Sequence, residues 1–238
     1  LPAAFCGVMG FKPTYGRISR YGLIAMASSL DQVGIFSHTA FDCALLLETM
    51  AGHDPKDMTS SMRPVEKYSE TVEKPLSPIT IGIPKEYRGD ADGVVEELIQ
   101  KAESMYSAVP EIKLVPVSLP HIRYSLAVYY ICMSSEVSAN LARYDGLRYG
   151  RDGADATTLE ELYRKNRAAG FGREVRRRIM LGTFALSAGY FDAYYAKAAR
   201  VRRLIQQDFE KAFQNVDFIL GPTSPTPAFT IGEKQENP

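Results

Sequence analysis

The stretch of residues 78–120 constrains the fold most, because it combines strand-like and helix-like patterns in one run. In "PITIGIPKEY", Ile79, Ile81 and Ile83 alternate with other residues, which predicts a short strand. Apolar residues then recur at helical spacing between 94 and 109, and "IKLVPVSLP" (112–120) predicts a second strand. A strand, a helix and a strand in this order predict a sheet with helices packed against it. The sequence therefore favours the α/β class.

The remainder of the chain predicts one α/β unit with most of its helices in the second half. "FCGVMGFKPT" predicts a buried strand that ends at Pro13, because proline cannot extend a ladder of hydrogen bonds. Thr39 is placed to cap a helix that Gly52 ends. The apolar face of this helix is expected to consist of Leu45, Leu46 and Met50. Further helices are expected over roughly 121–142, 157–168, 172–188 and 191–213, and a last strand over 218–220. The polar stretch 53–78, which contains four prolines, predicts a surface connection.

Charge and cysteine usage argue against several classes of protein. The net charge is zero, so no bulk field selects a polyanionic partner, although eleven Lys and Arg against two acidic residues lie between Arg164 and Arg203. Cys6, Cys43 and Cys132 are far apart and form no CxxC pair, so neither a zinc site nor a disulfide framework is indicated. Isolated cysteines in apolar surroundings favour a reducing cytosol. No apolar run approaches the roughly 20 residues that span a bilayer.

Motifs for self-contained catalysis are missing from the sequence. It contains no GxSxG, no P-loop, no HExxH and no GxGxxG followed by a helix. The spacing of His38, His53 and His121 indicates neither a metal site nor a catalytic triad. "ASSLDQVG" (27–34) has adjacent serines near an acid but no base, so turn and packing roles are expected for it.

One helix, "GREVRRRIMLGTFALSAGY", suggests a binding site for a carboxylate. At about 100° per residue, its apolar stripe consists of Val175, Ile179 and Leu186. Arg178 flanks this stripe, in line with the small residues Gly182, Ala185 and Gly189. A trough beside a guanidinium suits a carboxylate ligand, because arginine can donate two parallel hydrogen bonds to it. The alternative is close packing of two helices, with Arg178 in an ordinary ion pair.

A second residue, Tyr129, lies at the edge of another predicted helix. The core face of that helix is expected to consist of Leu126, Tyr130, Met133 and Val137. Tyr129 falls on the side shared with Glu136 and Asn140. Its hydroxyl can therefore reach a ligand or bond to a buried neighbour, and the pattern leaves both open.

Four blocks of the sequence resemble the amidase-signature family, and within it most closely the A subunits of tRNA-dependent amidotransferases. They are "LPAAFCGVMGFKPTYGRISRYGLIAMASSLDQVG" (1–34), "YYICMSSEVSANLARYDGLRYG" (129–150), "RRRIMLGTFALSAGYFDAYYAKAARVRRLI" (176–205) and "FILGPTSPTPAF" (218–229). The resemblance implies an amidase-signature fold, with a central mixed sheet flanked by helices. It also implies that residues 1–238 are a single fragment of one such domain.

The family chemistry is amide hydrolysis through a covalent acyl-enzyme, in which a Lys acts through a bridging Ser on a nucleophilic Ser. The resemblance places all three of these residues before Leu1, so no catalytic residue is expected in this chain. It places an Asp that holds the substrate beyond Pro238. The chain is therefore expected to be an internal fragment that is inactive alone. Tyr129 and Arg178 match the residues that contact the substrate, Arg178 pairing with its α-carboxylate.

The resemblance further implies a substrate and partners. In these A subunits the amide is glutamine, and the useful product is ammonia. The ammonia passes to the B subunit, which uses ATP and Mg²⁺ to activate a misacylated tRNA, and a small C subunit holds the two together. This chain itself is expected to need no cofactor or metal, to meet tRNA only through the complex, and to reside in the cytoplasm away from membranes.

Two other functions remain open from the sequence. The first is a free-standing amidase-signature hydrolase that acts on another amide, although a carboxylate-binding Arg178 favours an amino-acid substrate. The second is a nucleic-acid-binding module that uses the basic stretch 164–203. Its arginines are scattered around predicted helices, and no recognised nucleic-acid motif or predicted aromatic platform accompanies them.

Overall fold

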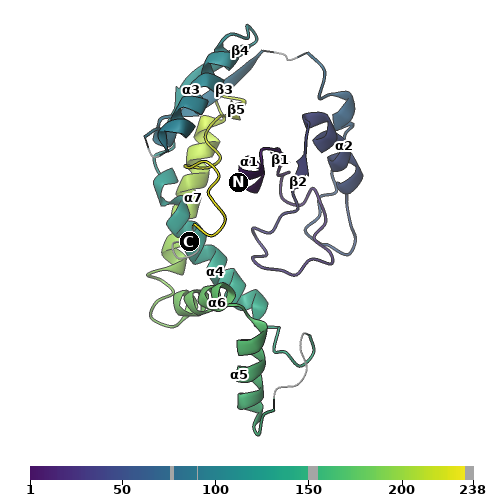
Figure 1. Ribbon diagram of the computed structural model, residues 1–238, viewed down its shortest axis with the longest axis vertical. Helices are drawn as coiled ribbons and strands as arrows, with labels where there is room; N and C mark the ends of the chain where they lie inside the picture. Colours follow the sequence, from purple (N-terminus) through teal and green to yellow (C-terminus); the bar gives the residue numbers. More distant parts are fainter. Residues whose placement is uncertain (76–77, 90, 150–154, 234–238) are drawn as a thin grey trace. The chain divides into compact units, whose positions relative to one another are not determined.

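The computed structural model describes residues 1–75, 78–89, 91–149 and 155–233, and four of its helices follow one another in the second half of the chain (Figure 1). The helices are α1 (Pro2–Cys6), α2 (Ala40–Met50), α3 (Gly93–Ser107), α4 (Ser125–Leu141), α5 (Leu159–Gly170), α6 (Arg173–Leu186) and α7 (Tyr195–Ala212), with short 3-10 turns η1 (Tyr68–Glu70), η2 (Lys85–Tyr87) and η3 (Ile122–Tyr124). The strands are β1 (Met9–Phe11), β2 (Ile35–Ser37), β3 (Ile79–Pro84), β4 (Ile112–Val117) and β5 (Phe218–Ile219). The α/β prediction is confirmed.

The chain clusters into two compact units. Unit 1 consists of Leu1–Tyr21, Gln32–Arg123 and Ile205–Pro238. Unit 2 consists of Gly22–Asp31 and Tyr124–Leu204. The described strands lie in unit 1, and α4, α5 and α6 lie in unit 2, while α7 contributes residues to both.

The predicted strand–helix–strand pattern of residues 78–120 is confirmed in unit 1. β3 pairs in parallel with β4 from Ile79 opposite Ile112, and α3 is the crossover between them. β5 joins the other side of β3, also in parallel, so the strand order is β4-β3-β5 (Figure 1). Asp92 caps the start of α3, because its side chain accepts a hydrogen bond from the backbone N–H of Val94.

The prediction of one buried strand through "FCGVMGFKPT" is wrong. Pro2 stands in the first turn of α1, where its fixed φ fits the start of a helix. Gly7 ends α1 with a φ of 64°, in the left-handed region that glycine adopts without strain. The strand is therefore limited to β1, which pairs antiparallel with β2 and whose residues are all exposed.

α2 begins as predicted but buries a different face. Thr39 Oγ1 accepts a hydrogen bond of 3.1 Å from the backbone N–H of Asp42, which confirms the cap. The predicted apolar face is wrong, because Leu45, Leu46 and Met50 are exposed and the buried residues are Cys43, Ala44 and Leu47. α2 carries apolar residues on most of its sides, so the spacing alone does not select a face. Packing selects it, since Cys43 and Leu47 form a core cluster with Ile18 and Ile35.

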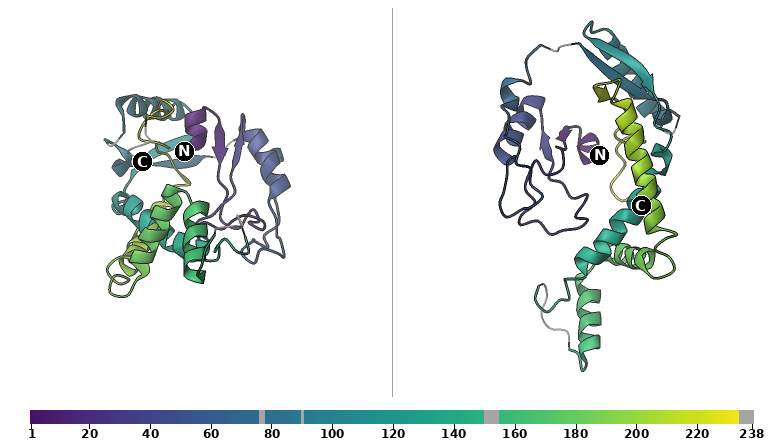
Figure 2. Two further views of the ribbon diagram at one scale, coloured as in Figure 1. Left: turned by 60° about the horizontal axis from the view of Figure 1, so that its bottom comes forward. Right: turned by 180° about the vertical axis from the view of Figure 1, so that it is seen from behind.

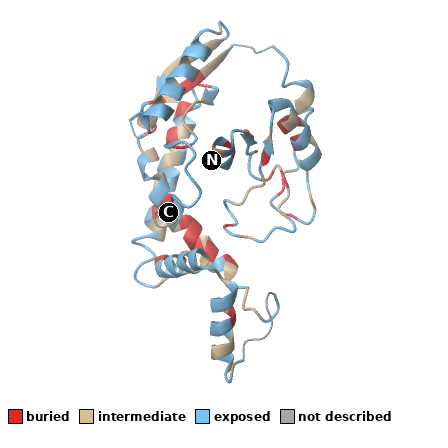
Figure 3. Ribbon diagram, in the orientation of Figure 1, coloured by how far each residue is buried: buried red, intermediate tan, exposed pale blue. Residues whose placement is uncertain are grey.

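Unit 2 is built on α4 and α6, which cross each other (Figure 2). Its core cluster consists of Ala27, Met133 and Val137, and buried positions follow α4 over much of its length (Figure 3). The predicted core face is correct at Met133 and Val137. It is wrong at Leu126 and Tyr130, which are exposed, because the first turns of α4 bury Val128 and Cys132 instead.

The surface connection was expected over residues 53–78, and the structure describes 53–75 of this stretch without a break. These residues contain η1 and two buried polar residues, Asp57 and Ser60. Residues 76, 77 and 78 complete that stretch, and 76 and 77 lie outside the described residues. Gly150, the last residue of the quoted block 129–150, lies outside them too, as does the end of the chain at 234–238.

Candidate substrate-binding site on two packed helices

The two helices that carry the predicted site residues pack at very short range in unit 2. A Cβ added to Gly182 of α6 would lie 1.9 Å from the backbone oxygen of Ser134 on α4. One residue further, Thr183 Oγ1 and Ser138 Oγ are 2.8 Å apart, in hydrogen-bond contact between the helices. Glycine is therefore required at 182, because any side chain there would push α4 away.

This contact corrects the predicted trough beside Arg178. Of the three small residues expected to leave space for a ligand, Gly182 and Ala185 are buried, and α4 fills the position of a Gly182 side chain. The third, Gly189, is exposed and lies beyond the end of α6. The predicted stripe is half-buried at Val175 and Ile179 and exposed at Leu186. Gly182 and Ala185 therefore serve the close packing of two helices, which is the alternative considered from the sequence.

Arg178 itself keeps unused hydrogen-bonding capacity. Its Nη2 lies 3.3 Å from Glu174 Oε1, one turn earlier on α6, and the side chain is 30% exposed. Its Nε is buried and has no hydrogen-bond partner among the described residues. A buried donor without an acceptor is costly, so this group favours an incoming oxygen atom. The Glu174 side chain of this ion pair is exposed, and ion pairs at exposed positions contribute little to stability.

Tyr129 lies on α4 and is 43% exposed. Its ring meets the ring of Tyr130 edge to face, with centroids 5.5 Å apart. The structure gives its hydroxyl no hydrogen bond within the described part of the chain. The hydroxyl is therefore available to a ligand.

The structure thus places Tyr129 and Arg178 in the same unit, on the two helices that pack together. No hydrogen bond or ion pair joins the two side chains within the described residues. Each retains a donor, the phenol O–H of Tyr129 and the Nε–H of Arg178. Donors of this kind suit a carboxylate or amide ligand.

Two residues of α4 whose role the sequence reasoning missed fasten the segment 26–31 to this helix. Glu136 accepts hydrogen bonds from Ser29, through the backbone N–H at 2.8 Å and the hydroxyl at 2.5 Å. Asn140 donates to the Met26 carbonyl at 3.2 Å and to Ser28 Oγ at 2.9 Å. The sequence offered one signal for this role, which is that Glu136 and Asn140 both lie on the side of α4 that carries Tyr129.

The same contacts agree with the turn and packing roles expected for "ASSLDQVG". Asp31 accepts hydrogen bonds from the backbone N–H groups of Met26 and Ala27, which closes the turn. Ala27 is fully buried in the core cluster of unit 2. The serines of this segment are therefore held by α4.

Cys132 is the thiol nearest in sequence to this arrangement, and its surroundings do not activate it. Burial raises the pKa of the Cys132 thiol, Arg202 opposes this effect, and Glu136 adds to it. A raised pKa keeps a thiol protonated and poorly nucleophilic at neutral pH. Cys132 is therefore not assigned a nucleophilic role.

The described residues show neither of two further features. No group of three or more His, Cys, Asp or Glu side chains among them is arranged to hold a metal ion. None of their helices is both long and apolar enough to cross a bilayer.

Known proteins are similar to this chain over its whole length. The family model described as Amidase matches residues 1–238. The A subunit of the glutamyl-tRNA(Gln) amidotransferase of Chromohalobacter salexigens is 54% identical over 236 residues, which are 99% of this chain and 48% of that protein. The corresponding A subunit of a Geobacillus species is 54% identical over 239 residues, which are 100% of this chain and 49% of that protein. The chain spans about half the length of these curated relatives.

A crystal structure of the A subunit of glutamyl-tRNA(Gln) amidotransferase from Thermotoga maritima is similar to this fold, with a TM-score of 0.73 and 37% identity. The match covers 99% of this chain and 46% of that one. The amidase-signature fold expected from the sequence is therefore confirmed for the part that this chain comprises. Since the family match extends from the first residue to the last, the chain belongs to the amidase family.

Proposed function

We propose that this chain forms part of the glutamine-hydrolysing A subunit of a tRNA-dependent amidotransferase, and that both of its units belong to one amidase domain. The observation that carries the proposal is the 54% identity to glutamyl-tRNA(Gln) amidotransferase A subunits over nearly the whole chain. Such identity extends well beyond the residues that amidases of different substrates need in common. The proposed setting is the cytoplasm.

The proposed reaction releases ammonia from the side-chain amide of glutamine and leaves glutamate. A serine attacks the amide carbon, ammonia departs, and water hydrolyses the acyl-enzyme. Ammonia then serves the B subunit, which uses ATP and Mg²⁺ to convert Glu-tRNA(Gln) to Gln-tRNA(Gln) or Asp-tRNA(Asn) to Asn-tRNA(Asn), and the C subunit joins the other two. No residue of this chain is assigned the attacking role.

Arg178 and Tyr129 are assigned to substrate binding. The buried, unpartnered Nε of Arg178 supports pairing with the glutamine α-carboxylate, since a guanidinium donates to a carboxylate through two nitrogens. The hydroxyl of Tyr129, which makes no hydrogen bond within the described residues, and its half-exposed ring support a contact with the same substrate. The pairing of α4 with α6 keeps both residues on a common framework.

The test is a kinetic comparison in the intact amidotransferase that contains this sequence. Replacing Arg178 with Ala is expected to raise the KM for glutamine about tenfold or more, because a charge-assisted hydrogen bond contributes about 1.5–3 kcal/mol. Arg176→Ala is the matched control, since Arg176 is exposed on the same helix, and it is expected to leave KM unchanged. An equal KM for the two variants would return Arg178 to a structural role.

The choice between glutamine and another amide needs a separate measurement. A free-standing amidase would release ammonia from simple aliphatic amides at least as well as from glutamine. The proposed glutaminase is expected to prefer glutamine and to lose that preference in Arg178→Ala, because only glutamine carries the α-carboxylate. Ammonia release from both substrates, measured side by side, separates the two functions.

A further inference from the structure

Within the described residues, Glu174 is the residue that forms an ion pair with Arg178, and the two lie one turn apart on α6. Glu174 Oε1 is 3.3 Å from Arg178 Nη2, and Glu174 Oε2 is 3.8 Å from Nη1 of Arg177. Residues four apart on a helix lie on the same side, so this pairing needs no other element. The carboxylate therefore holds one end of the Arg178 guanidinium through a contact that is local to α6.

This ion pair affects the orientation of Arg178 more than the stability of the helix. The side chains of Arg178 and Glu174 are 30% and 46% exposed, so water competes for both partners and the pair contributes little to folding. An arginine side chain nevertheless has many rotamers, and an acceptor at a fixed position reduces their number. Glu174 therefore restricts where the guanidinium points.

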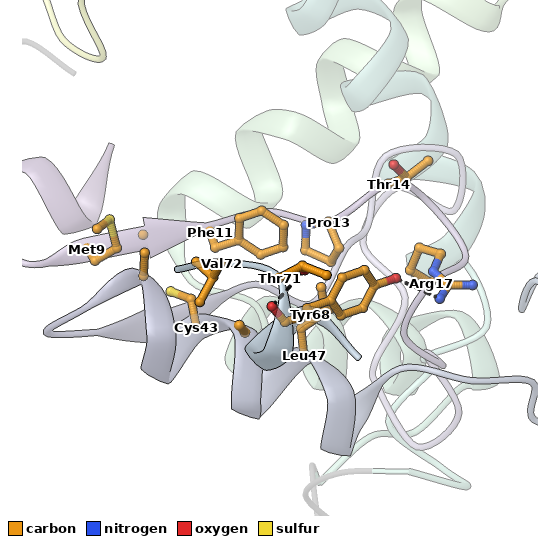
Figure 4. A pocket seen from close by; sticks show the side chains of 13 residues that line it. Met9, Phe11, Pro13, Thr14, Arg17, Cys43, Leu47, Tyr68, Thr71 and Val72 are labelled. Carbon is orange, nitrogen blue, oxygen red and sulfur yellow. Dashed lines mark hydrogen bonds between the residues drawn. The ribbon is translucent and has the colours of Figure 1, made fainter. Parts of the chain in front are cut away.

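Arg17 in unit 1 illustrates an arginine whose donors are used by the protein itself. It lies at a cavity of about 490 Å³ between β1, α2 and η1 (Figure 4). Its guanidinium donates to the carbonyls of Arg63 at 2.9 Å and Pro64 at 3.1 Å, and to Tyr68 Oη at 3.0 Å. These three hydrogen bonds hold it against protein atoms. Arg17 therefore has a structural role, although it lines a cavity.

Arg178 differs from Arg17 in the donors that remain. Its Nε is buried and has no partner in the described part of the chain, and Glu174 contacts Nη2. A guanidinium carries one hydrogen on Nε and two on each Nη. When Glu174 accepts the Nη2 hydrogen that points away from Nε, the second one lies parallel to Nε–H, and the two can bind one carboxylate. The contact with Glu174 is therefore compatible with a ligand carboxylate on the same guanidinium.

We infer that Glu174 is a positioning residue, which holds the Arg178 guanidinium so that its Nε edge is presented to the α-carboxylate of glutamine. This inference rests on the proposed function, because it requires Arg178 to bind that carboxylate. Glu174 acts through Arg178 and makes no contact with the substrate itself. Its negative charge also repels the substrate carboxylate, but water and salt screen this repulsion at an exposed position. The hydrogen bond to Arg178 therefore outweighs the charge.

The experiment compares KM and kcat for glutamine in the intact amidotransferase that contains this sequence. Glu174→Ala removes the acceptor and is expected to raise KM about three- to fivefold with kcat unchanged, because an exposed pair changes an equilibrium constant by no more than about fivefold. Glu174→Gln keeps an acceptor oxygen on a side chain of the same length. It is expected to restore most of the lost affinity, which separates the hydrogen bond from the charge.

Two further variants show whether Glu174 acts through Arg178. Arg177→Ala is the matched control, because Arg177 pairs with the other oxygen of Glu174 and is 61% exposed, and it is expected to leave KM unchanged. The double variant Glu174→Ala with Arg178→Ala is expected to have the KM of Arg178→Ala alone. A residue that acts only through Arg178 has no effect once that side chain is absent.

Three results would overturn the inference. An unchanged KM in Glu174→Ala would show that Arg178 is oriented without Glu174, and a lower KM would show that Glu174 competes with the substrate carboxylate. An equal further loss in the Arg178→Ala background would assign Glu174 a structural role. The proposed function fails separately, when the intact enzyme does not hydrolyse glutamine or when Arg178→Ala leaves its KM unchanged, and this inference then fails with it.

Discussion

At the residue scale, Gly182 decides how closely α4 and α6 approach. The position of its missing side chain is taken by the backbone oxygen of Ser134. Gly182→Ala is therefore expected to lower the free energy of unfolding by about 1–3 kcal/mol, because overpacking a tight contact forces the backbone to move. Chemical denaturation measures this change.

A second glycine supplies the control for that prediction. Gly170 is the last residue of α5, and nothing lies within 4 Å of an added Cβ there. Gly170→Ala is expected to leave stability unchanged or to raise it by up to about 1 kcal/mol, since alanine is the better helix former. A loss equal to that of Gly182→Ala would mean that the effect does not arise from the contact between α4 and α6.

Asp57 is a residue whose hydrogen bonds make stability depend on pH. The backbone N–H of Arg20 donates to it at 2.8 Å, and Thr59 donates through both its N–H and its hydroxyl. These bonds, with that of Arg20 the largest cause, lower the pKa of Asp57 from 3.8 to about 2. Because the folded pKa is depressed, the stabilisation is complete above pH 3.8 and is lost as the pH falls toward 2.

The corresponding variant is Asp57→Asn, which removes the titrating group. It is expected to flatten the dependence of the unfolding free energy on pH between about 2 and 4, as linkage requires. Thr59→Ala is expected to flatten it partly, since only one of the donors is lost. Denaturation midpoints across this range provide the measurement, and a slope identical to that of the parent would exclude the assigned role of Asp57.

At the scale of elements, α4 organises unit 2 through the segment that it holds. Asn140 satisfies both the Met26 carbonyl and Ser28 Oγ. Asn140→Ala is expected to speed hydrogen exchange of residues 26–31 about tenfold or more, because an unsatisfied buried group costs about 1–3 kcal/mol. Ser138→Ala is the control on the same helix, since Ser138 bonds to Thr183 of α6 and not to the segment. Similar exchange in both variants would show that general loosening of α4 is the cause.

At the scale of the whole molecule, the resemblance predicts a division between binding and attack. Under the proposed function, Tyr129 and Arg178 hold glutamine, and no residue of this chain is assigned to attack it. The polypeptide of residues 1–238, purified by itself, is therefore expected to release no ammonia from glutamine. A coupled assay for ammonia measures this, with a complete amidotransferase as the positive control. Turnover by the isolated polypeptide would show that it contains a nucleophile of its own.

Local patterns predicted the elements of this molecule with good accuracy. The alternating isoleucines of β3, the helical spacing before β4 and the Thr39 cap of α2 all describe interactions between residues close in sequence. α1 and β2 are exceptions: the apolar run after Leu1 resembles a strand until Pro2 and Gly7 are considered as helix signals, and no strand was predicted over Ile35–Ser37. Arg178 and Tyr129 were found partly by periodicity and mainly by resemblance, and their role in binding stays a prediction.

The sequence by itself determined the α/β class, most helix positions and the family, because these depend on local spacing and on extended similarity. Only the tertiary structure decided which face of α2 is buried, that α4 occupies the space beside Gly182, and that Glu136 and Asn140 hold the segment 26–31. Each of these contacts joins residues distant in sequence. Their energies depend on which surfaces meet in space, and that information is absent from the spacing of residues along one element.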